Sequence, residues 1–504
     1  MLVFAPALAL GRSASADPAP PCEILVLDDA GNVLDGDTAH AAVGRTPPAP
    51  AIDPDPDALR FVVRGPASAL PSFVSIQSFA RAENHARGAQ LDVLGSVRLE
   101  SVACPAGSAP ELACASTPRI RVAMDAVDRE HPLVRDRSLV GELDGSLYID
   151  GRGVAPREVA VRAPRGGPTV AATLHVRVLR LAPGGAPAVG SSDEDAIERV
   201  RHEIDQANRV WAQCGARFDA PPVAIDVVDP PPPHLVAVGC DNAMPASGGS
   251  IAFNVERPHK PGAKAELVGI AVDVAPGTTP AGAARLVARA VRKAGFVAIV
   301  SDTEAGLAGT YAPSDVSIRY ADGSLATVRA PGSDALSSDP TLDVCVGRVT
   351  LDDGLVHFDD ASATQGALEE RALVRAFDDG DPGTLDVYVV PSFRGANRIG
   401  ESFIASERGA IQNVVIEDRA GFRADSASFT LGHELGHVLL DDPGHPDDYA
   451  TDTPSLLMDS DSASSTAFGP RRIPLESCDV MMRESGPGAL VPLLFPVASA
   501  KQRK

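Results

Sequence analysis

The feature that most constrains this chain is the segment His433-Glu434-Leu435-Gly436-His437, in which two histidines lie four residues apart. On a helix such residues share one face, with Cβ atoms about 5–6 Å apart. Two imidazoles at this spacing can bind one ion with Zn–N bonds of about 2.0–2.1 Å. Apolar neighbours predict a largely buried helix: Phe429, Leu431, Leu435, Val438 and Leu439. Buried histidines and a buried glutamate need partners, so a metal site is favoured over a surface helix with solvated histidines.

Glu434 adds a general base to this pair. A glutamate directly after the first histidine points beside the metal, where it can take a proton from a metal-activated water and pass it to a leaving amine. Zinc lowers the pKa of that water and polarises the scissile carbonyl. The helix is expected to follow a strand over residues 413–417, to be capped by Asp425 or Ser426, and to end near Leu440. The segment therefore predicts a zinc hydrolase.

Residues 22–165 are predicted to form a β-rich domain. Short strand-like runs are separated by turn residues at residues 22–27, 59–63, 91–99, 119–123 and 146–149. This spacing is typical of an Ig-like or other β-sandwich. Residues 1–21 are predicted to be a leader that is either export-signal-like or disordered, since an apolar run precedes Ala14-Ser15-Ala16 without a basic n-region. We therefore expect a secreted or cell-envelope protein.

Residues 166–495 are predicted to form a second, catalytic domain with alternating strands and helices. It begins with a strand over 173–181, an amphipathic helix over 193–211 and a strand over 223–228. After an interruption, the pattern continues with a helix over 368–377 and strands over 384–390, 398–405 and 413–417. The predicted fold class is thus α+β multidomain: a β-sandwich-like domain followed by an α/β domain.

Residues from about 234 to 345 are predicted to be an α/β insertion in the second domain. A strand is expected over 267–274, and Thr279-Pro280 supplies a cap and a first-turn proline for a helix that ends before Gly295. Another strand follows over 296–300. Asp322-Gly323 is a strong turn signal for a hairpin between strands over 316–320 and 325–328. No catalytic constellation is apparent in this segment.

Residues from about 170 to 480 resemble a metzincin-type zinc peptidase. The resemblance rests on the strand and long helix over 173–211, the later strands, the His433-Glu434-x-x-His437 motif and a methionine-bearing turn at Met458. It implies a metzincin-like α/β zinc peptidase domain, with His433 and His437 as zinc ligands and Glu434 as general base. It also implies that Met458 packs under the metal and that an edge strand, here residues 398–405, binds an extended substrate by β-augmentation.

The third ligand is where the sequence departs from that family. The family pattern HExxHxxGxxH has glycine and histidine where this chain has Leu440 and Pro443. Pro443 is expected to end the helix, and Gly444 to permit a sharp turn that brings His445 to the metal. We therefore expect His445 to be the third ligand. The alternatives are a nearby carboxylate of Asp441, Asp442, Asp447 or Asp448, or a gluzincin arrangement with Glu476.

Cysteine spacing gives two candidate disulfides. None of the seven cysteines belongs to a CxxC pair, which leaves a cysteine zinc site or thioredoxin-type motif unsupported. Cys104 and Cys114 could close a small ring, and Cys240 and Cys345 could staple the insertion. The alternative is that some cysteines are simply buried apolar residues. The odd number leaves at least one thiol free or paired with another chain.

The acidic composition bears on the partners. A formal net charge of -22 repels phosphate backbones, so nucleic acid is not expected to bind. The sequence contains no run of 18 apolar residues, so a transmembrane helix is not expected. An aspartate cluster between residues 441 and 461 could bind Ca²⁺, but no EF-hand spacing appears and a solvated acidic loop is the preferred interpretation. Nothing in the sequence indicates the oligomeric state.

These observations predict a zinc-dependent metalloendopeptidase that hydrolyses protein or peptide substrates. The alternative from another class is a catalytically inactive extracellular binding or adhesin-like protein that retains a metal site. The presence of Glu434 argues against it, because a decayed site most easily loses its base. Zinc-dependent hydrolysis of a non-peptide substrate is the third hypothesis.

Overall fold

The protein has a mixed α+β fold, as predicted, in a computed structural model that divides into two compact units, residues 1–165 and 166–504. The structure describes residues 21–36, 39–42, 58–80, 88–123, 137–141, 145–162, 169–219, 223–258, 264–301, 311–332, 336–351, 366–378, 381–393, 399–406, 412–418, 429–448, 456–460 and 473–497. The predicted leader at 1–21 lies outside these residues except for Pro21.

Two sheets form the first unit and share one hydrophobic core. One has the order β10-β9-β4-β1-β2 with β8 and β7 attached to β4, and the other has the order β3-β12-β11-β5-β6. Buried residues such as Ile24 and Ile76 come from different sheets and meet in that core. The strands are β1 (Glu23–Asp28), β2 (Val33–Leu34), β3 (His40–Ala42), β4 (Leu59–Gly65), β5 (Phe73–Phe79), β6 (Gln90–Arg98), β7 (Glu100–Val102), β8 (Ala113–Ser116), β9 (Ile120–Ala123), β10 (Arg137–Val140), β11 (Ser146–Asp150) and β12 (Arg157–Arg162).

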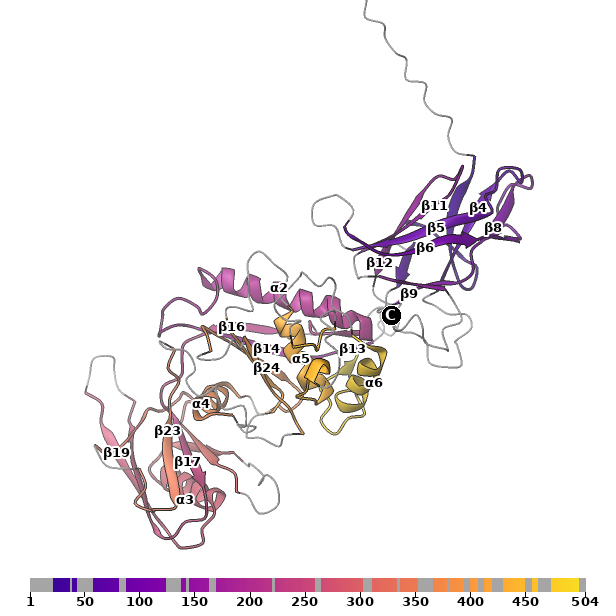
Figure 1. Cartoon of the computed structure of the whole chain (residues 1–504). Coiled ribbons are helices and arrows are strands. Elements are labelled where there is room, and N and C mark those ends of the chain that lie inside the picture. Colours follow the sequence, from indigo (N-terminus) through magenta and orange to yellow (C-terminus); the bar gives the residue numbers. More distant parts are fainter. Residues whose placement is uncertain are drawn as a thin grey trace, which may run out of the picture. The chain divides into compact units, whose positions relative to one another are not determined.

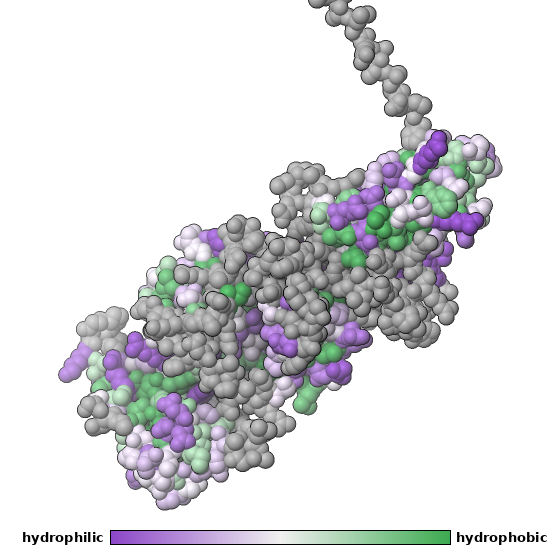
Figure 2. All heavy atoms as spheres, in the orientation of Figure 1, coloured by the Kyte–Doolittle hydropathy of each residue, from purple (hydrophilic) through white to green (hydrophobic). Residues whose placement is uncertain are grey.

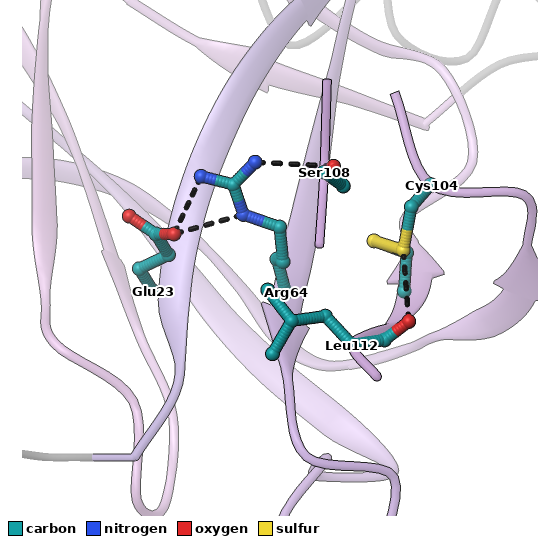
Figure 3. The surroundings of a disulfide bond; sticks show 6 residues. Glu23, Arg64, Cys104, Ser108 and Leu112 are labelled. Carbon is teal, nitrogen blue, oxygen red and sulfur yellow. Dashed lines mark hydrogen bonds and ion pairs between the residues drawn. A yellow bond between two sulfur atoms is a disulfide. The ribbon is translucent and has the colours of Figure 1, made fainter. Parts of the chain in front are cut away.

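The predicted disulfide between Cys104 and Cys114 is confirmed, and it closes the loop between β7 and β8. Beside it, Arg64 of β4 donates from Nε to Glu23 at 2.8 Å and from one terminal nitrogen to Ser108 at 3.1 Å (Figure 3). This guanidinium therefore ties the loop to the sheet. Cys22 is buried and is the free cysteine among the described residues.

The main sheet of the second unit carries the candidate site at its edge. Its order is β16-β14-β24-β26-β25. The first four strands run parallel, whereas the edge strand β25 pairs antiparallel with β26. The bounds are β14 (Leu174–Leu179), β16 (Ala224–Val228), β24 (Leu385–Val390), β25 (Gly400–Phe403) and β26 (Val414–Asp418). A small sheet of β13 (Val170–Ala171), β15 (Ala216–Arg217) and β27 (Phe495–Pro496) accompanies it.

Helices cover both faces of this sheet. Helix α2 (Asp193–Trp211) is capped by Ser192, whose side chain accepts a hydrogen bond from the backbone of Asp195, and it packs against α5 (Thr430–Leu440). Adjacent residues of β25 show that α5 and α4 (Leu368–Phe377) lie on opposite faces: Ser402 bonds to α5, whereas Phe403 shares a core with α4 (Figure 1). Helix α6 (Leu475–Glu484) packs against α5.

A disulfide between Cys214 and Cys478 joins the segment after α2 to α6, and the spacing of these two cysteines had not suggested their pairing. Both cysteines are buried. The bond therefore links the end of the α2 segment to α6 across 264 residues of sequence.

The insertion has its own core between two sheets and one helix. The sheets have the orders β20-β21-β17-β23 and β19-β18-β22, and α3 packs on them. The predicted disulfide between Cys240 and Cys345 is confirmed. Arg371 of α4 forms a buried ion pair with Asp315 of the insertion. The elements are β17 (Leu235–Ala243), β18 (Gly249–Glu256), β19 (Leu267–Val274), α3 (Pro280–Lys293), β20 (Val297–Val300), β21 (Ser314–Arg319), β22 (Val328–Arg329) and β23 (Leu342–Gly347).

Two local predictions were wrong. The Asp322-Gly323 turn forms, Leu325 bridges to Arg319 of β21 and Ala326 donates to Ile318, but β22 pairs with β18 of the other sheet, so the expected hairpin is cut short. Burial of Val328 in the insertion core explains this departure. Helix α5 begins at Thr430 with Phe429 as its N-cap, instead of at Asp425 or Ser426, which lie outside the described residues.

Hydrophilic residues are scattered among apolar ones over the face drawn in Figure 2. Among the described residues, none of the helices combines the length and the hydropathy that a membrane crossing requires.

Candidate metal centre

Three histidines converge at the C-terminal end of α5. His433 and His437 lie one turn apart on the helix, and His445 follows its end. The Nε2 atom of His433 is 3.2 Å from Nε2 of His437 and 3.3 Å from Nε2 of His445. His433 and His437 are buried, and His445 is partly exposed. This group can hold a metal ion, with one nitrogen from each ring.

Oxygen acceptors orient the other ring nitrogen of each histidine. Nδ1 of His433 lies 2.7 Å from the carbonyl oxygen of Leu457, and Nδ1 of His437 lies 2.7 Å from that of Asp442. A carbonyl oxygen only accepts, so each Nδ1 carries a proton, and in the neutral ring each Nε2 then has a lone pair. His445 has a weaker counterpart, with Nδ1 3.5 Å from a carboxylate oxygen of Asp448. Such oxygen partners are typical of histidines that bind metal through Nε2.

The helix ends at Leu440, as expected. Its C-cap is Asp441, which adopts the left-handed conformation with φ 53°, so the chain reverses there and not at Gly444. The Asp441 carboxylate also accepts a hydrogen bond from the backbone of Ser406 at 2.8 Å, which fixes the helix end to the segment after β25. Because the chain reverses at Asp441, the residues between it and His445 can lead the chain back toward the helix.

Among the side chains that the structure describes, the alternative third ligands do not join the histidine group. Asp441 and Asp442 are engaged with backbone nitrogens of Ser406 and Gly444. The Asp448 carboxylate instead accepts a hydrogen bond from the His445 backbone nitrogen and lies near Nδ1 of its ring. Glu476 is exposed on α6. The side chain of Asp447 lies outside the described part of the chain.

Glu434 lies on the same helix but faces the edge strand β25. It is 8% exposed. Ser402 of β25 donates its hydroxyl proton toward Glu434, with Oγ 2.5 Å from Oε2 of the carboxylate and 2.9 Å from the Glu434 carbonyl oxygen. Two residues earlier, Gly400 has no side chain, and a Cβ there would overlap Oε1 of the same carboxylate. The carboxylate thus lies against the backbone of the strand.

Met458 packs beneath the histidine-bearing helix. It is buried, and a Cβ at Gly436 would overlap its Sδ atom. The preceding residue, Leu457, supplies the carbonyl oxygen that orients His433. On the same side, Trp211 of α2 donates from Nε1 to the carbonyl oxygen of Gly432 at 2.9 Å. The methionine turn and α2 therefore hold α5 in place together.

A second group of potential ligands, Cys240, Asp241 and Cys345, occurs in the described residues. Its two cysteines form a disulfide and offer no thiolate for a metal. The aspartates considered for Ca²⁺ do not form a ligand group in the described part of the acidic segment, and Asp452 and Asp461 lie outside it.

Ser402 and Gly400 are the site residues that the sequence analysis missed. The sequence held one weak indication of their role. Gly400 and Ser402 lie two residues apart on a short strand before the motif helix, so they face the same side of the sheet. Their contact with Glu434 depends on how α5 lies against β25, which no local pattern specifies.

No family model matches the chain, and no curated protein matches it.

Proposed function

We propose that this protein is a zinc-dependent metalloendopeptidase with a metzincin-like catalytic unit. The observation that carries the proposal is the arrangement of three histidine Nε2 atoms around one point with Glu434 on the same helix. The edge position of β25 and the burial of Met458 under α5 support the resemblance to that peptidase family.

The donor set fits zinc. The Nε2 atoms of His433 and His437 lie 3.2 Å apart, and both have lone pairs because their Nδ1 atoms carry the protons. Such an approach is unfavourable unless a cation lies between the lone pairs. Tetrahedral Zn–N bonds of about 2.0–2.1 Å place neighbouring nitrogens about 3.3 Å apart, which agrees with the observed separations. Three neutral histidines with one open position are a common catalytic zinc set.

When bound, zinc would lower the pKa of a water molecule and polarise the substrate carbonyl. Glu434 would take the proton from the attacking water and deliver it to the leaving amine. The carboxylate is separate from the three-nitrogen group, which suits a base better than a ligand. A pair of Nδ1–H bonds to carbonyl oxygens keeps His433 and His437 in the tautomer that offers Nε2.

The substrate would be an extended segment of a protein or peptide. An antiparallel edge strand leaves one row of backbone groups without a strand partner, and an extended peptide can pair with that row. β25 has this position next to α5. The three disulfides among the described residues support a secreted or cell-envelope location, where such bonds persist.

The test is a peptide-library digest with the zinc-loaded full chain, its Glu434→Gln variant and a chelator-treated sample. We expect the wild type to cleave, and Glu434→Gln and the chelated protein to lose cleavage, while the variant still binds about one zinc per chain. Glu476→Gln, at an exposed position of α6, is the matched control and should cleave like the wild type.

Two outcomes count against the proposal. One is a folded wild type that binds zinc but cleaves no library peptide. The other is a Glu434→Gln variant that retains full cleavage, because the amide cannot accept the proton.

A further inference from the structure

We propose that Ser402 is a positioning residue. Together with the absence of a side chain at Gly400, it fixes the Glu434 carboxylate in one orientation. The assignment rests on the proposed function, because it concerns the general base of that reaction. Neither residue belongs to the HExxH motif or to the histidine group.

The first argument is the double contact of one hydroxyl. Ser402 Oγ lies 2.9 Å from the Glu434 carbonyl oxygen and 2.5 Å from its Oε2. A hydroxyl has one proton, so it donates to one of these oxygens at a time. The short distance to Oε2 favours the carboxylate, since hydrogen bonds between a hydroxyl and a carboxylate are about 2.5–2.7 Å long. Oε2 is therefore the carboxylate oxygen that Ser402 binds.

The second argument is the absence of a side chain at Gly400. Gly400 and Ser402 alternate along β25 and face the same side. A Cβ at Gly400 would overlap Oε1, Cδ and Cγ of Glu434. The carboxylate consequently rests directly on the strand backbone, with Ser402 at one end. Any larger residue at position 400 would displace the base toward the helix.

This contact has a consequence for substrate binding. The strand that would pair with the substrate is the strand that holds the base, so β25 sets the position of the base relative to the bound peptide. A base fixed before the substrate arrives needs no reorganisation during proton transfer. Loss of the hydroxyl should therefore reduce turnover more than substrate affinity.

The experiment compares Ser402→Ala and Ser402→Thr with the wild type, all zinc-loaded, by steady-state kinetics and crystal structures. Ser402→Ala should lower kcat about 10- to 100-fold with KM and zinc content unchanged. Ser402→Thr keeps the hydroxyl and should recover most of the loss. Ser406→Ala is the control, because the described contact of Ser406 is made by its backbone nitrogen.

The structures provide the readout that does not depend on activity. Glu434 should occupy one rotamer in the wild type and in Ser402→Thr, and several in Ser402→Ala. A single unchanged rotamer in Ser402→Ala would overturn the inference, as would an unchanged kcat. If the wild type cleaves no peptide, the proposed function fails, whereas the rotamer comparison still decides the role of Ser402.

Discussion

Met458 fills the space that a side chain at Gly436 would occupy. A Cβ built at Gly436 would overlap Sδ of Met458 and would lie 3.2 Å from Cζ2 of Trp211. Both neighbours are buried, so neither has free space to move into. The glycine between the two histidines of α5 is therefore a packing requirement of the methionine turn beneath the helix.

Gly436→Ala should destabilise the protein by up to about 2 kcal/mol. Alanine is favoured over glycine inside a helix by about 1 kcal/mol, but overpacking a buried site costs about 1–3 kcal/mol. Displacement of Met458 would also shift Leu457, whose carbonyl oxygen orients His433, so zinc affinity should fall. Urea denaturation and zinc titration measure the two effects.

Gly432→Ala is the matched control within the same helix. Its nearest neighbour would be Cα of Ala207 at 3.6 Å, an ordinary van der Waals contact. Helix propensity should then dominate, and stability should be unchanged or slightly higher. If both glycine variants behave alike, the packing argument for Gly436 is wrong.

Asp448→Ala should weaken zinc binding about 10-fold. The carboxylate accepts a hydrogen bond from the backbone of His445 at 2.9 Å and lies 3.5 Å from its Nδ1. Loss of such an outer partner typically lowers metal affinity by about 10- to 100-fold, and the exposed carboxylate suggests the lower end. Competition with a chromogenic chelator measures the change.

The control for Asp448 is Asp273→Ala. Asp273 is exposed on β19, so the substitution removes the same charge outside the histidine group. Equal losses in the two variants would point to the overall charge of the protein and not to the support of His445.

His234 should make the second unit sensitive to acid. Its ring is fully buried, Nδ1 lies 2.9 Å from the Pro232 carbonyl oxygen, and Nε2 has no hydrogen-bond partner among the described residues. Burial, with a smaller effect from the positive charge of Arg319, lowers its pKa from 6.5 to about 4, although the bond to Pro232 acts in the opposite direction. The fold therefore favours the neutral ring.

The lowered pKa of His234 makes the folded protein less stable in acid. The unfolded chain binds the proton near pH 6.5, whereas the folded protein resists it until about pH 4, so stability is full above pH 6.5 and falls as the pH decreases. One pKa unit corresponds to about 1.4 kcal/mol, which gives a loss of about 3 kcal/mol at pH 4. His234→Leu, compared with the exposed His202→Leu, should remove this difference between pH 7 and pH 4 in urea denaturation. Retention of the full difference in His234→Leu would show that another group is responsible.

Local signals predicted several elements of the second unit, although β17, β18, β23 and α6 were not among the expected ones. The apolar spacing and the Ser192 cap of α2, and the β-branched run of β24, are encoded within each segment and reappear within about one residue of the expected bounds. The histidine spacing likewise specifies one face of α5. The convergence of His445 on that face was expected from its position after the helix, and the structure brings the three rings together.

What local signals could not supply is the packing between elements. Ser402 contacts Glu434 because β25 lies at the edge of the sheet next to α5, and that arrangement follows from strand order. The reversal occurs at Asp441 because its carboxylate gains a partner at Ser406, which is 35 residues earlier in the sequence. Cys214 and Cys478 pair for the same reason, through the packing of α6 near the end of α2.

Replacement of Cys214 and Cys478 by alanine should cost more stability than replacement of Cys104 and Cys114. The first disulfide spans 264 residues and the second spans 10. In the chain-entropy treatment these closures stabilise by about 5–6 and about 3 kcal/mol, because a longer loop restricts the unfolded chain more. Denaturation of each double variant, with a separate midpoint for each unit, measures the loss of stability that each disulfide removal causes. Since Cys478 is carried by α6, which packs against α5, the first variant should also lose zinc at a lower urea concentration than the wild type. Equal losses in the two units would show that loop length does not determine the contribution of these disulfides.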